Sequence, residues 1–597
     1  MNPGGLAASA AINLGLAVVV LSLFSVLKRQ PYNAPVYLAK CMSTGESMPG
    51  GWCRSSSARC AVPSFAWIPA AFRLSEEEVI RMCGLDALVV LRLFKFGMKF
   101  FSVCSLVGLL ILVPVNYYAS QESSDKARIS HSLDSFSISK VERGSNWLWV
   151  HFSCLCIISF YVTYLLHKEY KEILEKRIRH LDLNRKRPDQ FTVLVRGIPL
   201  CMEHREHGCY VDHFFSKHYN SAYYAYQIVH DRRNIEQLMK SANSIEQKIK
   251  RLRNKIEHQR SSVFASAKTE SIEKKEAKLE DIHRKIRGLQ CGNMLKQKDL
   301  PVAFVTFKSR VGATLAAEGQ QHENPLLLTT EHAPEPKDVL WHNLDIPYRC
   351  LVIHRIGVFV AAVLLTVFFT IPVTAVQGIV QFEKIKQWFP PARAVQLIPG
   401  LNSILTGYLP SAILNGFIYL IPYAMLGMAS LGGMVSKSKK EMKACSMVFY
   451  FLVGNVFFLS VLSGSLLNQI GKSFAHPKEI PSRLASAVSA QSDFFITYIL
   501  TDGMSGFSFE VLQFGFLTWN FLKGHLFSRE SVQEPYLYGF PYYRVIPIVS
   551  LAILIGMVYA VIAPLLLPFL VVYFLLGYAV FLNQASSLFR YVCTRID

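Results

Sequence analysis

The chain alternates between long apolar runs and strongly polar segments, and this pattern predicts a helical membrane protein. Each run is near or above the ~20 residues that a helix needs to cross ~30 Å of hydrocarbon. We predict nine spans, at residues 6–27, 96–118, 146–167, 351–377, 404–433, 444–470, 490–521, 545–563 and 565–582. The last two runs are short and are separated by Pro564, which predicts a tight hairpin or a broken helix.

Basic residues between the runs predict the orientation of the spans. Lys and Arg are concentrated in 28–95, 168–350, 436–443 and 522–544, and basic loops stay on the cytosolic side. The N-terminus then lies outside and the C-terminus in the cytosol. The first run has no basic segment before it and is followed by Lys28 and Arg29, so we interpret it as a retained span and not as a signal peptide.

The 168–350 segment is predicted to be a cytosolic α/β domain between a three-span region (1–167) and a membrane domain (351–584), with a short tail at 585–597. Residues 191–197, 222–230 and 303–307 have the pattern of strands, and the charged 231–290 stretch predicts an inserted helical hairpin.

Residues 303–307 are similar to the aromatic strand of an RNA-recognition motif (RRM), whose Phe rings stack on bases. However, Phe304 and Phe307 fall on opposite faces of a strand, so at least one is expected in the core. A basic domain beside a membrane more simply meets anionic lipid, and nucleic acid is not an expected partner.

Five polar side chains in the later runs are candidates for lining a cation path: Gln377, Asn415, Asn455, Asp502 and Glu510. Carboxylates at membrane depth are costly and mark functional sites. Glu510 is favoured because an unpaired carboxylate costs several kcal/mol in apolar surroundings. For Asn415 and Asn455, hydrogen bonding between helices is an equally good interpretation.

Two further groups of residues have a functional and a structural interpretation. Gly503 and Gly506 lie beside the acids and predict a gating hinge, although membrane helices also use glycine for close packing. The lysines that open the 436–443 link either contact anionic lipid headgroups or only fix the orientation; they are Lys437, Lys439, Lys440 and Lys443.

Composition excludes several classes of protein. The chain is 51% hydrophobic yet carries a formal net charge of +21, which a soluble globular protein seldom combines. Its 13 cysteines are scattered and predicted to be reduced, although Cys53 and Cys60 are close enough to pair. We recognise no Cys/His cluster at zinc spacing, so no metal site or cofactor is predicted. No motif of a nucleotide-binding or hydrolytic enzyme is recognised, so no enzyme is predicted.

Several short motifs, in their order along residues 1–584, resemble those of the OSCA/CSC family of calcium-permeable stress-gated cation channels. Before the membrane domain they are GLDA (84–87), FTVLVRGIP (191–199), AFVTF (303–307) and APEPKDVLW (333–341). Within it they are TGYLP (406–410), FFITY (494–498) with Asp502-Gly503, YAVIAP (559–564) and the 573–584 stretch.

This resemblance implies a fold similar to that of the anoctamin channels and scramblases. It implies homodimers that meet through an RRM-like cytosolic domain with helical arms, and one pore per subunit lined by the fourth to eighth spans. Gating by membrane tension or hyperosmotic stress is implied, with Ca²⁺ and monovalent cations as permeant ions. Glu510 falls at an acidic position of the family's seventh span. After Gln584 the chain departs from the family pattern, with nine spans where eleven are usual, which predicts a truncated form.

The sequence therefore predicts a mechanosensitive or hyperosmolality-gated, calcium-permeable channel of the plasma membrane. A lipid scramblase or lipid-sensing protein of the same architecture is an alternative, as is a non-conducting truncated isoform. A membrane-anchored RNA-binding scaffold is a less favoured alternative.

Overall fold

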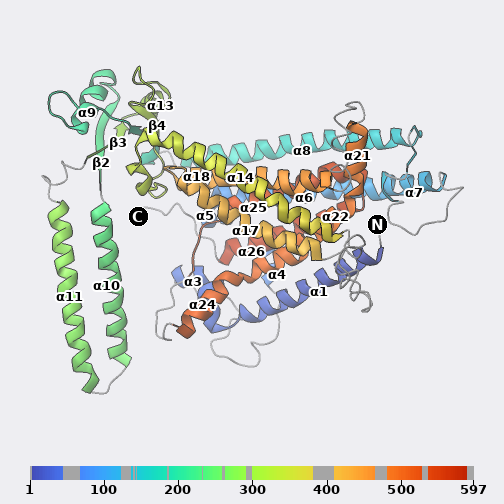
Figure 1. The fold of residues 1–597 in the computed structure, drawn as a ribbon, viewed down its shortest axis with the longest axis horizontal. Helices are drawn as coiled ribbons and strands as arrows, with labels where there is room; N and C mark the ends of the chain where they lie inside the picture. Colours follow the sequence, from blue (N-terminus) through green and yellow to red (C-terminus); the bar gives the residue numbers. More distant parts are fainter. Residues whose placement is uncertain are drawn as a thin grey trace.

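In the structure, a computed structural model, long helices run side by side and a small α/β domain lies at one end of them (Figure 1). The N-terminus lies at the other end. The structure describes residues 3–44, 67–122, 136–138, 141–142, 144–183, 187–231, 233–258, 263–290, 299–380, 409–463, 480–526 and 536–587. Cys53, Cys60 and most of the predicted tail lie outside these residues.

Three long helical segments dominate the N-terminal region. They are α1 (Pro3–Leu27), α6 (Leu85–Val107) and α8 (Leu148–Leu183), and α6 continues through a π-helical turn, η3 (Gly108–Leu112), into α7 (Val113–Glu122). Short helices between α1 and α6 are α2 (Ala34–Tyr37), α3 (Ala39–Thr44), α4 (Trp67–Phe72) and α5 (Glu76–Cys83).

The membrane domain is also helical. It contains α14 (Tyr348–Val380), α17 (Leu409–Leu431), α18 (Lys437–Leu452), the π-helical turn η11 (Val453–Phe458), α19 (Leu459–Ser463) and α21 (Ile480–Ala490). It ends with α22 (Ser492–Thr501), the π-helical turn η13 (Asp502–Gly506), α23 (Phe507–Leu512), α24 (Phe514–Leu526), α25 (Tyr542–Ile562) and α26 (Leu566–Ser587). Among the described residues, 7 helices are long and apolar enough to cross a membrane. The helical membrane fold is thus confirmed, and the count of nine spans stays a prediction.

The seventh predicted span, 490–521, is not one helix, which corrects the prediction. It begins with α22, passes through η13 and ends with α23, because Gln513 adopts a left-handed conformation with φ 51°. The Gln513 side chain donates to the backbone carbonyl of Glu510 at 2.9 Å and so satisfies a carbonyl at the end of α23. Helix α24 then begins separately at Phe514.

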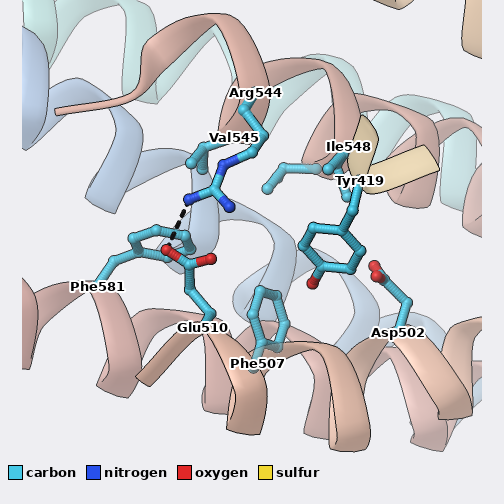
Figure 2. Close-up of a pocket in the computed structure, with 9 residues that line it drawn as sticks. Tyr419, Asp502, Phe507, Glu510, Arg544, Val545, Ile548 and Phe581 are labelled. Carbon is cyan, nitrogen blue, oxygen red and sulfur yellow. Dashed lines mark hydrogen bonds and ion pairs between the residues drawn. The ribbon is translucent and has the colours of Figure 1, made fainter. Parts of the chain in front are cut away.

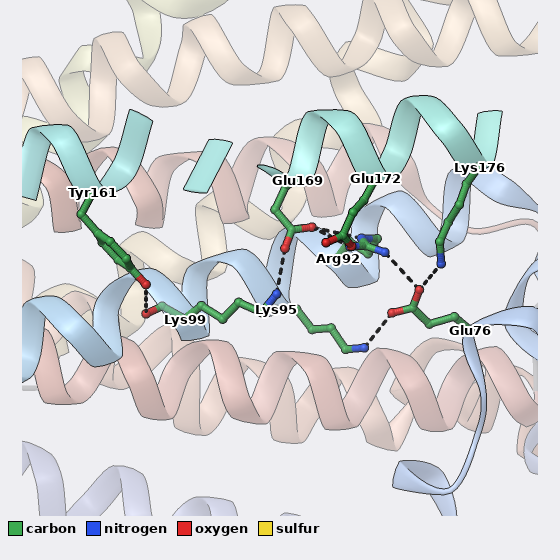
Figure 3. A network of polar contacts seen from close by, with 8 residues as sticks. All are labelled: Glu76, Arg92, Lys95, Lys99, Tyr161, Glu169, Glu172 and Lys176. Atoms are coloured by element: carbon green, nitrogen blue, oxygen red, sulfur yellow. Dashed lines mark hydrogen bonds and ion pairs between the residues drawn. The ribbon is translucent and has the colours of Figure 1, made fainter. Parts of the chain in front are cut away.

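Helices α6 and α8 extend well beyond the predicted spans, to Leu85 and to Leu183. The predicted loop 28–95 and domain 168–350 therefore each lose a helical segment. The reason is that the charged turns of α5, α6 and α8 face one another and neutralise one another (Figure 3). The network contains Glu76, Arg92, Lys95, Lys99, Glu169, Glu172 and Lys176.

Arg92 is the centre of this network. Its Nη1 lies 3.1 Å from Glu76 Oε2 and its Nε lies 3.1 Å from Glu169 Oε2, and it also pairs with Glu172. Glu76 binds Lys95 Nζ at 2.9 Å and pairs with Lys176. Three helices are thereby tied together at the ends of two long membrane helices, where charge is tolerated because each ion has partners.

Helices α6 and α26 pack closely through two glycines that receive aromatic rings from the other helix. A Cβ at Gly97 of α6 would lie 2.3 Å from Phe574, and a Cβ at Gly577 of α26 would lie 2.3 Å from Phe94. Neither position has room for a side chain. This reciprocal contact brings the two backbones together, as small residues do in membrane proteins.

The α/β domain that is predicted to be cytosolic, called the cytosolic domain below, contains a four-stranded antiparallel sheet with the strand order β2-β3-β1-β4. The strands are β1 (Thr192–Arg196), β2 (Tyr223–His230), β3 (Asp299–Phe307) and β4 (Thr329–His332). Helix α9 (His207–His218) follows β1 and α13 (Arg310–Glu318) follows β3, which is a ferredoxin-like chain order. Between β2 and β3, α10 (Arg233–His258) and α11 (Val263–Gln290) form the predicted hairpin, which projects from the sheet (Figure 1).

Side chains pack on both faces of the sheet around β1 and β3, whereas much of β2 is exposed. Phe307 is 2% exposed and packs under α9 and α13, among Val211, Phe215 and Ala313. Phe304 lies on the other face and contacts the ring of Trp341, with centroids 6.0 Å apart. The prediction that at least one of these rings belongs to the core is confirmed. Neither ring lies on a bare sheet face of the kind on which bases stack.

The network around Glu76 makes the stability of the protein depend on pH. Burial acts to raise the pKa of Glu76, but hydrogen bonds from Lys176 and Lys95 outweigh it and lower the pKa from 4.5 to about 2. Because the pKa is lowered on folding, the stabilisation is fully present above pH 4.5 and is lost as the pH falls from 4.5 toward 2.

We therefore expect Glu76→Gln to lower the thermal unfolding midpoint of the detergent-purified protein at pH 7. The difference in midpoint between the variant and the wild type should shrink as the pH falls below 4.5. In that range the wild type progressively loses the stabilisation that ionised Glu76 provides. Exposed Glu77 on the same turn provides the control, since Glu77→Gln should leave the midpoint unchanged. A deficit that stays constant from pH 7 to pH 3 would contradict the assignment.

Candidate functional site

A small pocket lies where the interrupted helix α22–η13–α23 meets α17, α25 and α26 (Figure 2). Two predicted site residues, Asp502 and Glu510, both line it, so the structure brings them together. The other lining residues are Tyr419, Phe507, Arg544, Val545, Ile548, Val549 and Phe581.

The π-helical turn η13 positions the first acid and contains both predicted hinge glycines. Such turns are rare and occur frequently at functional sites. Both glycines are tightly packed here. A Cβ at Gly503 would lie 2.9 Å from the Tyr573 ring, and a Cβ at Gly506 would lie 2.8 Å from the Tyr419 hydroxyl oxygen. Close packing, the structural alternative, is therefore present in this conformation, and a hinge role stays a prediction.

Glu510 is paired, which corrects the premise on which it was favoured. Its Oε1 accepts a hydrogen bond from Arg544 Nη2 at 2.7 Å, and the two side chains are only 7% and 13% exposed. Arg544 was interpreted as one of the basic residues of the 522–544 loop, but it lies in the first turn of α25 and points at Glu510 (Figure 2). The sequence places the two residues 34 positions apart, and nothing in their local patterns indicates that they meet.

Asp502 is the carboxylate without a cation beside it. It is 4% exposed, and no described Lys, Arg or His lies within ion-pair distance of it. The ring of Tyr419, from the facing helix α17, lies beside its carboxylate (Figure 2). The cost of an unpaired acid, which was assigned to Glu510, therefore applies to Asp502.

The three predicted amides have different surroundings. Asn455 lies in η11 and donates to the backbone carbonyl of Thr366 in α14 at 3.2 Å, which is the helix-to-helix bond of the alternative interpretation. Asn415 is buried in α17, and neither atom of its amide has a hydrogen-bond partner in the structure. Gln377 lies within α14, and its side chain is outside the described part of the structure.

Sequence reasoning missed a polar contact that holds the acid-bearing helix against α1. The amide of Asn13 donates to Thr501 Oγ1 at 3.1 Å and accepts from Ser505 Oγ at 2.6 Å. All three side chains are buried. A polar Asn in the middle of the first apolar run could have indicated this contact, since Asn415 was selected for the same reason.

The four lysines differ in their surroundings. Lys437 and Lys443 are exposed at the start of α18, and Lys440 is half-buried. Lys439 is paired, with its Nζ 2.8 Å from Glu331 Oε2 in β4. One of the four predicted lipid contacts is thus engaged by the cytosolic domain, and lipid contact by the other three stays a prediction.

The start of α18 is clamped to the cytosolic domain by the linker that precedes α14. Asp338 Oδ1 accepts from the backbone N–H and the hydroxyl of Ser438, each at 3.0 Å, and Asp338 also binds the hydroxyl of Ser436. The backbone of Leu340 donates to the Val435 carbonyl at 2.6 Å. Ser436 is the N-cap of α18, so these contacts fix the position at which this membrane helix begins.

Three family models match successive parts of the chain. Residues 5–169 match a model described as "Late exocytosis, associated with Golgi transport". Residues 190–343 match "Cytosolic domain of 10TM putative phosphate transporter". Residues 354–593 match "Calcium-dependent channel, 7TM region, putative phosphate". The boundaries follow the division into N-terminal helices, α/β domain and membrane domain.

Relatives with curated names align with nearly the whole chain. Hyperosmolality-gated Ca²⁺ permeable channel 2.5 of Arabidopsis thaliana is 56% identical over 594 residues, which are 99% of this chain and 82% of the relative. Channel 2.3 of the same plant is 36% identical over 97% of this chain and 82% of the relative. Channel 2.1 is 35% identical over 99% of this chain and 79% of the relative. The chain therefore belongs to the family of hyperosmolality-gated Ca²⁺-permeable channels.

Proposed function

We propose that this chain forms a calcium-permeable cation channel that opens under hyperosmotic stress or membrane tension. The observation that carries the proposal is the pocket of Figure 2, in which a buried carboxylate without an ion-pair partner, Asp502, lies beside the Glu510–Arg544 pair. Relatives named as hyperosmolality-gated Ca²⁺ permeable channels, one of them 56% identical to this chain, support the same function.

The chemistry of the pocket suits a cation. Calcium prefers oxygen ligands, and cation-selective pores are commonly lined by acidic side chains. Asp502, Glu510 and the hydroxyl of Tyr419 offer such oxygens around the pocket. The unpaired amide of Asn415 is one further candidate ligand on α17. Two carboxylates against one guanidinium leave an excess of negative charge, which favours cations over anions.

Gating requires a conformation in which the path is wider. The π-helical turn at Asp502–Gly506 is a natural point of bending, because helices kink at such turns. We propose that tension changes the bend there and moves α23 relative to α25, which separates Glu510 from Arg544. The Asp338 clamp then lets the cytosolic domain influence the position of α18, which packs beside α25.

The proposed setting is the plasma membrane, with the N-terminus outside. The N-terminus of α1 lies at the end of the helices opposite the α/β domain (Figure 1), as the positive-inside pattern requires if that domain is cytosolic. Two chains are proposed to meet through the cytosolic domain. The orientation is tested by labelling an N-terminal tag on intact cells, where the tag should be accessible from outside. Elution of the purified protein as a monomer would contradict the dimer.

The decisive test is pressure-clamp recording from liposomes that contain the purified protein. We expect suction to evoke cation currents that Ca²⁺ can carry, and protein-free liposomes should show none. Absence of such currents from protein shown to be folded would refute the channel function for this chain. A dithionite assay on the same liposomes identifies the alternative, since lipid scrambling without current would favour a scramblase.

A second expectation concerns the ion pair. Glu510→Ala should lower the unitary cation current and the preference for cations over anions, because it removes a negative charge and leaves Arg544 unpaired beside the path. The double variant Glu510→Ala/Arg544→Ala restores the balance of charge and should recover most of the cation preference. An unchanged unitary current in Glu510→Ala would remove Glu510 from the path.

A third expectation concerns the clamp. Asp338→Ala should lower the pressure for half-activation without changing the unitary current, because the clamp stabilises the present position of α18 and lies away from the pocket. Loss of a capping contact costs about 1 kcal/mol, so the shift should be measurable. Asp281→Ala, on the exposed hairpin, removes only a surface pair with Lys285 and provides the control. Equal thresholds in the two variants would exclude the clamp from gating.

A further inference from the structure

The structure brings Cys and His side chains together in the cytosolic domain at a spacing that the sequence analysis did not recognise. Cys201 and His204 lie in the turn after β1, and Cys209 and His213 lie four residues apart on one face of α9. The spacing is Cys-x₂-His-x₄-Cys-x₃-His. It escapes a search for Cys-x-x-Cys because a histidine takes the second place of the first pair.

The side chains converge on one point. The ligand atoms of Cys201, His204 and Cys209 all lie within 4.8 Å of one another. Cys209 Sγ is 3.3 Å from His204 Nδ1 and 4.0 Å from His213 Nδ1. Bonds of ~2.3 Å to sulfur and ~2.0 Å to nitrogen in a tetrahedral site place ligand atoms roughly 3.3–3.8 Å apart. The ligand atoms of Cys201, His204 and Cys209 are close to this spacing. His213 lies near Cys209 alone, and its side chain must turn toward the other two to complete the set.

The backbone of the turn is arranged around the first sulfur. The N–H groups of His204 and Glu203 hydrogen-bond to the thiol of Cys201, which is only 7% exposed. The turn closes through Arg205, whose N–H donates to the Cys201 carbonyl at 3.0 Å and whose φ is 53°. A non-glycine residue in the left-handed region is uncommon, and here it returns the chain so that His204 faces α9.

One neighbouring imidazole does not compete for the site, although the Glu203 carboxylate lies 3.9 Å from His204 Nδ1. His207 lies between the two pairs, but its Nδ1 faces the Pro199 carbonyl at 3.3 Å. The next turn of α9 packs into the domain core through Val211 and Phe215. The side chain of His204 is 61% exposed, so an ion can enter from solvent.

We propose that Cys201, His204, Cys209 and His213 form a structural zinc site that ties the turn after β1 to helix α9. Two thiolates and two imidazoles in a tetrahedral arrangement are a zinc-binding set, whereas Ca²⁺ and Mg²⁺ prefer oxygen. The site lies away from the membrane pocket and is independent of ion conduction. Its effect is to fix the start of α9, and with it the edge of the sheet beside β2.

The first test measures metal in the full-length protein, purified through a tag without histidines and without chelators. We expect one equivalent of zinc per chain by plasma mass spectrometry. X-ray absorption at the zinc edge should give two sulfur and two nitrogen neighbours. Cobalt substituted for zinc should give the absorption bands of a tetrahedral thiolate site. These measurements need no variant, so they remain valid if a variant misfolds.

The second test uses the double variant Cys201→Ser/Cys209→Ser, which should lose the bound zinc and lower the unfolding midpoint. The controls are Cys350→Ser, an exposed cysteine on α14, and His218→Gln, on α9 outside the cluster, and both should keep their zinc. Full-length protein that binds no zinc even after incubation with the ion would overturn the proposal. So would equal zinc in the double variant, or a Cys201–Cys209 disulfide found by mass spectrometry in protein purified under reducing conditions.

Discussion

The ion pair between Glu510 and Arg544 is the constraint around which the membrane domain is arranged, because each buried charge is offset by the other. Both side chains are almost fully buried, and removing one partner of such a pair costs roughly 3–5 kcal/mol. The end of α23 is secured around the pair. Gln584 of α26 donates to the Glu510 carbonyl at 2.9 Å, and the Tyr37 hydroxyl of α2 donates to the Leu512 carbonyl at 2.7 Å. An acid-bearing helix end is thus held by three other elements.

A continuous physical connection runs from this pair to the cytosolic domain. Arg544 belongs to α25, which packs against α18 within the same apolar core. Helix α18 begins at the clamp made by Asp338, and Val435, just before it, belongs to the core on one face of the sheet. Because a helix is stiff, a displacement of its first turn is felt along its length. A chain of packed and hydrogen-bonded contacts, which passes through the Ser436 cap, thus joins the sheet to the pocket.

Features fixed by local pattern could be predicted from the sequence. The apolar runs identified the helices, and the alternation of Phe304 and Phe307 correctly placed one of them in the core. Features that depend on partners distant in sequence could not be predicted. The extension of α8 to Leu183 depends on Arg92 from another helix. The break at Gln513 depends on a left-handed backbone conformation of this one residue, and glutamine is not a residue type that predicts a turn. In the pocket, both acids were predicted from the sequence. The pairing of Glu510 with Arg544 was not predicted, because Arg544 follows a basic loop and was assigned to it.

The pairing also bears on which cations the pocket suits. In the present conformation Arg544 occupies one oxygen of Glu510, so an incoming cation meets only the carboxylate of Asp502 without a competitor. With both acids ionised, the three charged groups sum to one negative charge, which a monovalent cation neutralises. A movement that withdraws Arg544 leaves two negative charges and frees the Glu510 oxygens, and this matches a divalent cation. Separation of the pair would therefore change the width of the pocket and its preferred ion in a single step.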